Sequence, residues 1–104
     1  MVKRKIIWLR TAELDMLDIM LYYIERNKSK EYSTSLYRGI NSKLKTLNFT
    51  ISLPQKTSVN DLYYFTYNHI SVFFIIKELN TIIVKFVIDD RRNPLALEKF
   101  FSDL

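Results

Sequence analysis

The stretch that decides the fold runs from Leu62 to Asp89 and reads LYYFTYNHISVFFIIKELNTIIVKFVID. It is dominated by valine, isoleucine, phenylalanine and tyrosine, which are enriched in β-strands, and two short turn-prone gaps interrupt it. Gaps this short join antiparallel neighbours, so the sequence predicts a three-stranded antiparallel meander. The predicted strands are residues 62–67, 70–77 and 81–89.

Helical patterns lie upstream of this meander. Lys3 to Arg10 is predicted to form a strand, and Thr11 then fits the N-cap of a helix that ends near residues 26–28. The core stripe predicted for this helix has apolar residues at helical spacing, namely Leu14, Leu17, Leu21 and Ile24. Further apolar residues widen the stripe and predict burial on more than one side: Met16, Ile19, Met20 and Tyr23.

A second helix is predicted over residues 30–47, followed by a loop over residues 48–60 that contains Pro54. The core stripe of the second helix is predicted to be Leu36, Ile40, Leu44 and Leu47. After the meander, Asn93-Pro94 places a capping residue before a proline and predicts a short terminal helix. The apolar stripe of this terminal helix is Leu97, Phe100, Phe101 and Leu104.

The predicted order is therefore β-α-α-β-β-β(-α), which indicates an α+β fold with an antiparallel sheet packed on a helical hairpin. The chain has 104 residues, so we expect a single domain over residues 1–104. It has no cysteine and one histidine, which excludes a disulfide framework and a thiolate metal site. We expect no metal and no cofactor.

The net charge is +5 and its excess lies in the first half of the chain. Residues 1–47 hold ten Lys/Arg against five Asp/Glu, whereas residues 48–104 hold six against six. Such a balance suits an anionic partner such as nucleic acid or an acidic peptide, although solvated helix faces would give the same count. The N-terminal apolar run stops at Arg10 without a cleavage site, and no apolar stretch has membrane-spanning length, so we expect a cytoplasmic protein.

The element order and four local features resemble the RelE/ParE superfamily of bacterial toxins. The features are Trp8 followed by residues 11–19, Tyr22-Tyr23 near the end of the first helix, the Leu44…Leu47…Pro54 run, and Asp89-Asp90-Arg91-Arg92-Asn93-Pro94 after the last strand. This last motif is similar to the ending of a ParE-like branch. The resemblance implies the toxin of a type II toxin–antitoxin module that a cognate antitoxin neutralises. One branch of the superfamily cleaves mRNA on the ribosome, and another poisons DNA gyrase.

Cleavage of an RNA backbone requires a base, an acid and cations that stabilise the charged phosphorane. Where the nuclease branch has strand lysines, this chain has Tyr63, Tyr64, Phe65 and Thr66, and Ser71 stands where that branch has an arginine. We therefore expect the protein to act by binding a macromolecular target, with DNA gyrase as the leading candidate. The missing cations favour a binding protein over an enzyme. The expected target-binding residues are Lys56, Arg91 and Arg92.

Two alternatives stay open. The chain could be a ribosome-dependent mRNA endonuclease with an atypical site, in which His69, Lys85 and Arg91 act, or an inactive remnant. A lone histidine in a hairpin turn is more often exposed and idle, and Asp89 could form only a local ion pair with Arg91 that shapes the turn. The terminal stripe of Leu97, Phe100, Phe101 and Leu104 is the expected interface with an antitoxin or with a second copy in a homodimer.

Overall fold

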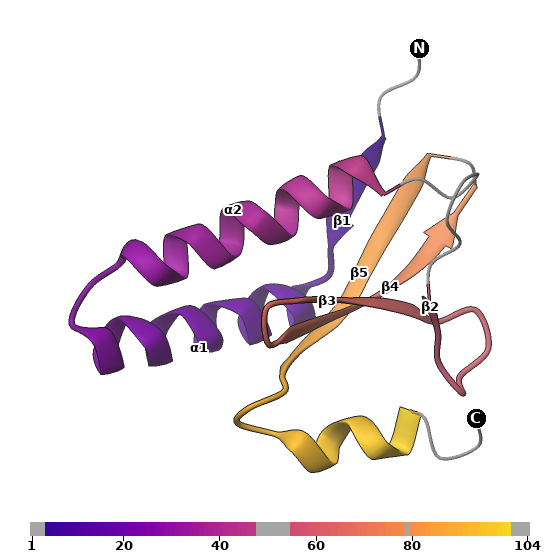
Figure 1. The fold of residues 1–104 in the computed structure, drawn as a ribbon. Helices are drawn as coiled ribbons and strands as arrows, with labels where there is room; N and C mark the ends of the chain where they lie inside the picture. Colours follow the sequence, from indigo (N-terminus) through magenta and orange to yellow (C-terminus); the bar gives the residue numbers. More distant parts are fainter. Residues whose placement is uncertain (1–3, 48–54, 79, 101–104) are drawn as a thin grey trace.

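The computed structural model describes residues 4–47, 55–78 and 80–100, apart from the side chains of residues 97, 99 and 100. Two helices form a hairpin against a five-stranded sheet, and a short 3₁₀ helix follows the last strand (Figure 1). The elements are β1 (Lys5–Trp8), α1 (Arg10–Asn27), α2 (Glu31–Thr46), β2 (Gln55–Lys56), β3 (Tyr63–Tyr67), β4 (Ile70–Lys77), β5 (Thr81–Asp89) and η1 (Pro94–Phe100).

The sheet has the order β1-β5-β4-β3-β2, which confirms the α+β class and the helical hairpin. The meander of β3, β4 and β5 is antiparallel, as predicted. Two features differ from the prediction. The first strand pairs in parallel with β5, from Lys5 opposite Thr81 to Trp8 opposite Val84, so the sheet is mixed. The predicted loop also contains a two-residue strand, β2, whose partners in β3 are Tyr63 and Tyr64.

Helix α1 faces the core with a different stripe from the one predicted. Its buried residues are Ala12, Met16, Ile19 and Tyr23. The last three were predicted only to widen the stripe, and Ala12 was not part of it. The predicted leucines Leu14, Leu17 and Leu21 are about half exposed, and Ile24 is partly buried. Apolar residues nearly encircle this helix, so their spacing alone does not show which side packs on the sheet. The N-cap is Leu9 rather than Thr11, and no side chain caps the helix.

Helix α2 packs with the predicted stripe. Leu36, Ile40 and Leu44 are buried, and Leu47, just after the helix, packs against the same core. The only glycine of the chain, Gly39, lies in this helix beside the Tyr67 ring of β3. A methyl group at Gly39 would collide with that ring, which explains why a residue unfavourable to helices stands here.

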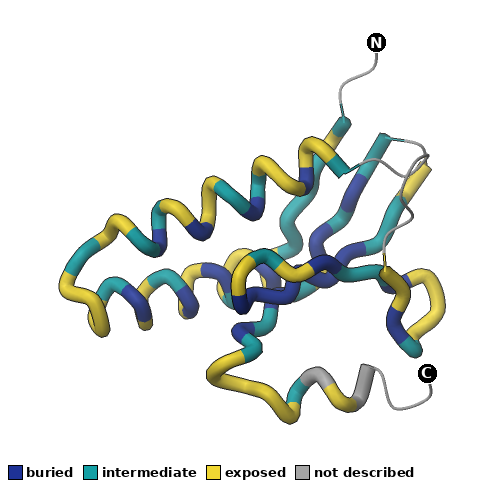
Figure 2. The backbone as a smooth tube through the Cα atoms, in the orientation of Figure 1, coloured by how far each residue is buried: buried dark blue, intermediate teal, exposed yellow. Residues whose placement is uncertain are grey.

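Successive side chains of a strand point to opposite faces of the sheet, and along β5 buried positions alternate with less buried ones (Figure 2). On the face towards the helices, Phe65, Val72 and Phe74 join the buried core cluster with the helix residues. On the other face the rings of Tyr64, Phe73 and Phe86 stack across three strands, with centroids 5.8 Å and 4.6 Å apart. About half of the strand aromatics are therefore core, as the alternation predicts.

A β-bulge interrupts the pairing of β4 with β5. Phe73 is opposite Phe86, but the next residue, Phe74, is opposite Val84, so Lys85 is the extra residue. The backbone N–H of Val87, just beyond the bulge, donates to the Asp15 carboxylate of α1 at 3.0 Å. Burial raises the pKa of Asp15, the Val87 hydrogen bond opposes that rise, and nearby Asp18 adds to it. This bond ties the first half of α1 to the bulged strand.

The chain beyond β5 turns at residues 90–93 and enters η1 at Pro94, where the sequence predicts the start of a helix. Leu95 in η1 is 74% exposed. The predicted terminal stripe lies outside the described residues, because the side chains of Leu97 and Phe100 and all of Phe101 and Leu104 are not described. Within the described ranges, no helix combines the length and the apolar character that crossing a membrane would need.

Candidate functional site

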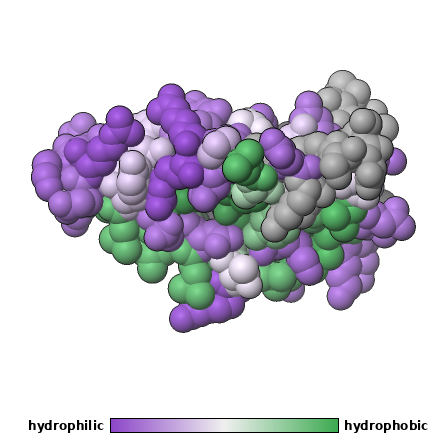
Figure 3. All heavy atoms as spheres, turned by 90° about the horizontal axis from the view of Figure 1, so that it is seen from below, coloured by the Kyte–Doolittle hydropathy of each residue, from purple (hydrophilic) through white to green (hydrophobic). Residues whose placement is uncertain are grey.

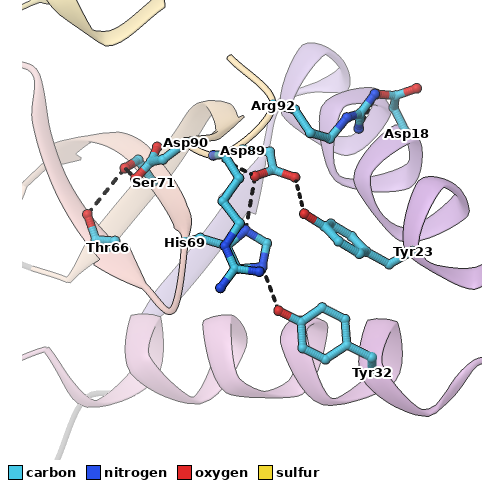
Figure 4. A network of polar contacts seen from close by, with 10 residues as sticks. Asp18, Tyr23, Tyr32, Thr66, His69, Ser71, Asp89, Asp90 and Arg92 are labelled. Carbon is cyan, nitrogen blue, oxygen red and sulfur yellow. Dashed lines mark hydrogen bonds and ion pairs between the residues drawn. The ribbon is translucent and has the colours of Figure 1, made fainter. Parts of the chain in front are cut away.

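A buried polar cluster lies at the end of the sheet where the β3–β4 turn meets the end of β5 and the turn of the helical hairpin (Figure 4). Tyr23 comes from the last part of α1, Tyr32 from the first turn of α2, and Asp89 from the last position of β5. His69 lies in the two-residue turn, and Asn68 before it takes a left-handed conformation with φ of 56°. Asparagine accepts this backbone shape more readily than most residues, which allows the tight turn.

Asp89 is the acceptor at the centre of this cluster. Its Oδ1 lies 3.0 Å from His69 Nδ1 and 3.1 Å from the backbone nitrogen of Arg91. Its Oδ2 accepts a hydrogen bond from the Tyr23 hydroxyl at 2.8 Å. The carboxylate is 1% exposed, so these three donors replace the water it has lost.

The hydrogen bonds fix the tautomer of His69. An ionised carboxylate only accepts, so His69 carries its proton on Nδ1, and Nε2 accepts from the Tyr32 hydroxyl at 2.5 Å. Both ring nitrogens are therefore engaged. His69 is 8% exposed, so the expectation that a histidine in this turn is exposed to solvent is wrong. The Tyr23, Tyr32 and His69 rings pack together with centroids 5.2–6.0 Å apart.

The pKa values follow from this arrangement. Burial raises the pKa of Tyr23 to about 12, and the adjacent Asp89 carboxylate acts in the same direction. Burial would also raise the pKa of Asp89, but hydrogen bonds from Tyr23, His69 and the Arg91 backbone outweigh it and leave the pKa lowered. The cluster therefore holds a neutral phenol beside an ionised carboxylate at neutral pH.

A second polar group involves the next residue, Asp90. Its Oδ2 accepts a hydrogen bond from the Ser71 hydroxyl at 2.9 Å, and Ser71 also contacts the Thr66 hydroxyl at 3.2 Å. The other carboxylate oxygen of Asp90 is buried without a partner within the described part of the chain. Burial raises the pKa of Asp90, the Ser71 hydrogen bond lowers it, and the neighbouring Asp89 raises it. Ser71 therefore brings a carboxylate to the position where the nuclease resemblance places a cation.

The cations predicted at the site come from different parts of the fold. Lys85 is exposed at the bulge, Lys56 is exposed on β2, and neither forms a hydrogen bond or ion pair with His69 in the described ranges. Arg91 is exposed and adjoins the cluster, because its backbone N–H donates to Asp89 at 3.1 Å. Its charge lowers the pKa of Tyr23. Asp89 does shape the turn, but it does so through the backbone N–H of Arg91, where the sequence suggested an ion pair.

Arg92 is held against α1. Its guanidinium lies 4.1 Å from the centroid of the Tyr22 ring and 3.3 Å from Asp18. This contact fixes the turn between β5 and η1 to the helical hairpin. The two adjacent tyrosines make different contacts. The Tyr22 ring packs against the Arg92 guanidinium, and the Tyr23 hydroxyl donates to Asp89.

The sequence did not predict the parts that Tyr23 and Tyr32 play in this cluster. The available signal was a tyrosine hydroxyl at an apolar stripe position, together with an aspartate ending a strand that is otherwise apolar. Buried hydroxyls and carboxylates require partners, so these residues were candidates to meet. Among the described residues, no group of three or more His, Asp or Glu side chains could hold a metal ion.

Comparison of the chain with models of known protein families gives no match, and comparison with curated proteins gives none either.

Proposed function

We propose that this protein is the cytoplasmic toxin of a type II toxin–antitoxin module, which acts by binding a macromolecular target and is neutralised by a cognate antitoxin. DNA gyrase is the first candidate for the target. The proposal is supported by the order of the elements, a strand and a helical hairpin followed by an antiparallel meander. It is also supported by the Asp89-to-Pro94 motif that follows β5.

The observation that favours binding over RNA cleavage is the Ser71–Asp90 pair. A phosphorane carries negative charge and requires fixed cations around it. Here the position expected for a cation has a hydroxyl that donates to a partly buried carboxylate, 2.9 Å away. A negative charge at that place would repel a phosphate rather than stabilise it.

Arg91 is the residue proposed to contact the target. Three bonds to Asp89 fix its turn, since the N–H groups of Arg91, Arg92 and Asn93 all donate to the side chain or carbonyl of that residue. Its own side chain is exposed. A guanidinium on a fixed turn can form a bidentate contact with a carboxylate or phosphate of the target. Lys56 and Arg92 are proposed to add positive charge around this contact.

We expect Arg91→Ala to weaken target binding by about tenfold to a hundredfold, which corresponds to one lost charge-assisted hydrogen-bond pair. The measurements are growth inhibition on induction and the inhibition of purified gyrase in a DNA relaxation assay. Arg38→Ala, which removes an exposed cation from α2, is the matched control and should leave both unchanged. Equal loss of activity in the two variants would show that only net charge matters.

A second candidate function, mRNA cleavage, is favoured by one observation. The His69–Asp89 pair has the geometry of a general base oriented by a carboxylate. For His69 to act, Tyr32 would have to leave Nε2 and expose the ring to RNA.

The interface predicted at Leu97, Phe100, Phe101 and Leu104 remains a prediction, and the neighbouring exposed Leu95 is consistent with an apolar contact there.

We expect no codon-phased mRNA cuts when the protein is expressed, because loss of one oriented cation costs about a hundredfold to a thousandfold in such reactions. Primer extension on translated mRNA checks this. The opposite result would be cuts that appear with the wild type and vanish in His69→Gln, while circular dichroism shows the variant to be folded. That result would favour mRNA cleavage over target binding. A protein without gyrase inhibition, cuts or toxicity would be an inactive remnant.

A further inference from the structure

Three side chains of the buried polar cluster form a chain of hydrogen bonds that ends on a phenol. The Asp89 carboxylate lies 3.0 Å from Nδ1 of His69, and the other ring nitrogen, Nε2, accepts from the Tyr32 hydroxyl at 2.5 Å (Figure 4). A nucleophile within hydrogen-bond reach of a base, with the base oriented by a third group, is the arrangement that activates serine and cysteine for covalent catalysis. Here a phenol stands in the place of the nucleophile.

Burial decreases along this chain of bonds. Asp89 is 1% exposed and His69 is 8% exposed, whereas Tyr32 is only partly buried. Tyr32 lies in the first turn of α2, directly after the hairpin turn, where residues 25–31 are all polar. The hairpin end of the molecule, at the left of Figure 3, is hydrophilic on the face shown. The base and the carboxylate are therefore shielded, and Tyr32 is the member of the three that solvent reaches most readily.

The base is held in the form that this chemistry requires. Asp89 only accepts, so neutral His69 carries its proton on Nδ1, and the lone pair of Nε2 faces the Tyr32 hydroxyl. Tyr23 donates to the other oxygen of Asp89 at 2.8 Å, and its ring packs between those of His69 and Tyr32. These contacts restrict rotation of the imidazole, so the base and the phenol are preorganised.

The charge around the cluster indicates which electrophile it takes. Asp89 and Asp90 bring two carboxylates to this end of the sheet, and one oxygen of Asp90 is buried without a partner in the described part of the chain. Two carboxylates repel a phosphate group, which disfavours a phosphoryl donor. The carbonyl group of a thioester or an ester is uncharged and meets no such repulsion. The substrate class that fits is therefore an activated acyl compound.

We propose that Tyr32 is a nucleophile that His69 and Asp89 activate towards thioesters and other activated esters. As the phenol oxygen forms a bond to the carbonyl carbon, Nε2 of His69 takes the phenol proton. The bond from this carbon to the leaving group then breaks, and the thiol or alcohol departs with that proton. The product is an O-acyl tyrosine, and nothing is oxidised or reduced. This site is independent of the toxin proposal, and unlike RNA cleavage it keeps the Tyr32 hydroxyl on His69.

The first test compares two tyrosines within the wild-type chain, with p-nitrophenyl acetate as the acyl donor. Tyr37 is the internal control, because it is 43% exposed and its hydroxyl has no hydrogen-bond partner among the described residues. We expect Tyr32 to be acetylated at least about tenfold faster although it is less exposed, since an oriented base contributes about a hundredfold or more to such a step. Peptide mapping by mass spectrometry identifies the site, and hydroxylamine removes acetyl groups from phenols but not from lysines. Equal or faster acetylation of Tyr37 would overturn the proposal.

The pH profile distinguishes base catalysis from a phenol that is merely reactive. An exposed phenol reacts as its anion, so its rate rises about tenfold for each pH unit until the phenol ionises near pH 10. A phenol whose proton passes to a neutral imidazole does not have to ionise first. Over one unit above neutral pH we expect the Tyr32 rate to rise by less than about threefold, while that of Tyr37 rises about tenfold. This measurement needs no variant, and parallel profiles for the two tyrosines would contradict the proposal.

His69→Gln keeps a polar side chain but removes the base. It should lower the acetylation rate of Tyr32 to that of Tyr37 or below, with the fold checked by circular dichroism. Tyr22→Phe is the matched control, because it removes a tyrosine hydroxyl beside the cluster but outside the chain of bonds, and it should leave the Tyr32 rate unchanged. Fast acetylation of Tyr32 that survives His69→Gln would show that the base is not required. An acetyl group on His69 that persists in Tyr32→Phe would make the histidine the nucleophile, and the assignment to Tyr32 would be wrong.

Discussion

Asp89→Ala is expected to lower the free energy of unfolding by on the order of 3–5 kcal/mol. The carboxylate is 1% exposed and accepts from Tyr23, His69 and the backbone of Arg91. Its loss leaves the donors on Tyr23 and His69 buried without their acceptor. Chemical denaturation followed by circular dichroism measures the change.

Asp90→Asn is the control, because Asp90 is the next residue but its pKa is raised where that of Asp89 is lowered. We expect a change within about 1 kcal/mol, or a gain in stability, since an ionised Asp90 opposes folding at neutral pH. A loss as large as that of Asp89→Ala would show that the Ser71–Asp90 pair, and not the Asp89 cluster, holds this end of the sheet.

The two aspartates also predict the pH dependence of stability. The lowered pKa of Asp89 means that its contribution is fully present above its ordinary value of 3.8 and is lost as the pH falls through the lower folded-state value. Asp90, with a raised pKa, has the opposite sign, and its penalty is relieved as the pH falls towards 3.8. Denaturation midpoints measured across pH 2–7 should therefore show a shallow optimum in the wild type, and its acid limb should shrink in Asp89→Ala.

Leu44→Ala should cost on the order of 2–5 kcal/mol, the usual range for a fully buried leucine. Leu44 is 0% exposed in the core between α2 and the sheet. For a domain of this size, such a loss lowers the melting temperature by roughly 10 °C or more.

Leu17→Ala is the matched comparison, since the same atoms are removed from a side chain that is 51% exposed. We expect it to cost less than about 1 kcal/mol, as substitutions at surface positions do. The sequence alone predicts equal costs for the two leucines. Equal costs in a thermal melt would show that Leu17 belongs to the core.

The sequence predicts the meander well because its strands are fixed by local patterns. Runs of β-branched and aromatic residues end at turn-prone gaps, and the structure starts or ends each strand within a residue of those gaps. The stripe of α1 is different. Leu17 and Met16 are both apolar, and only contact with the sheet decides which of them is buried.

The polar cluster could not be predicted for a related reason. In a regular strand Val84 and Val87 would face opposite sides, and Asp89 would lie away from Val84. The extra residue Lys85 reverses the alternation, so that Val84, Val87 and Asp89 all face the helices. Neither the place of a bulge nor the meeting of His69 with Tyr32, far apart in the chain, is encoded in a local pattern.

The parallel pairing of β1 with β5 has a consequence for how the protein is made. The partner of Lys5 is Thr81, so most of the chain lies between two residues that must meet. During translation β1 emerges from the ribosome before β5, so it has no pairing partner until β5 has emerged. Contacts between distant segments are slow to form, because loop closure comes before any gain in pairing. We expect the helical hairpin to form first on the nascent chain, and the β1 edge to close only after β5 has emerged.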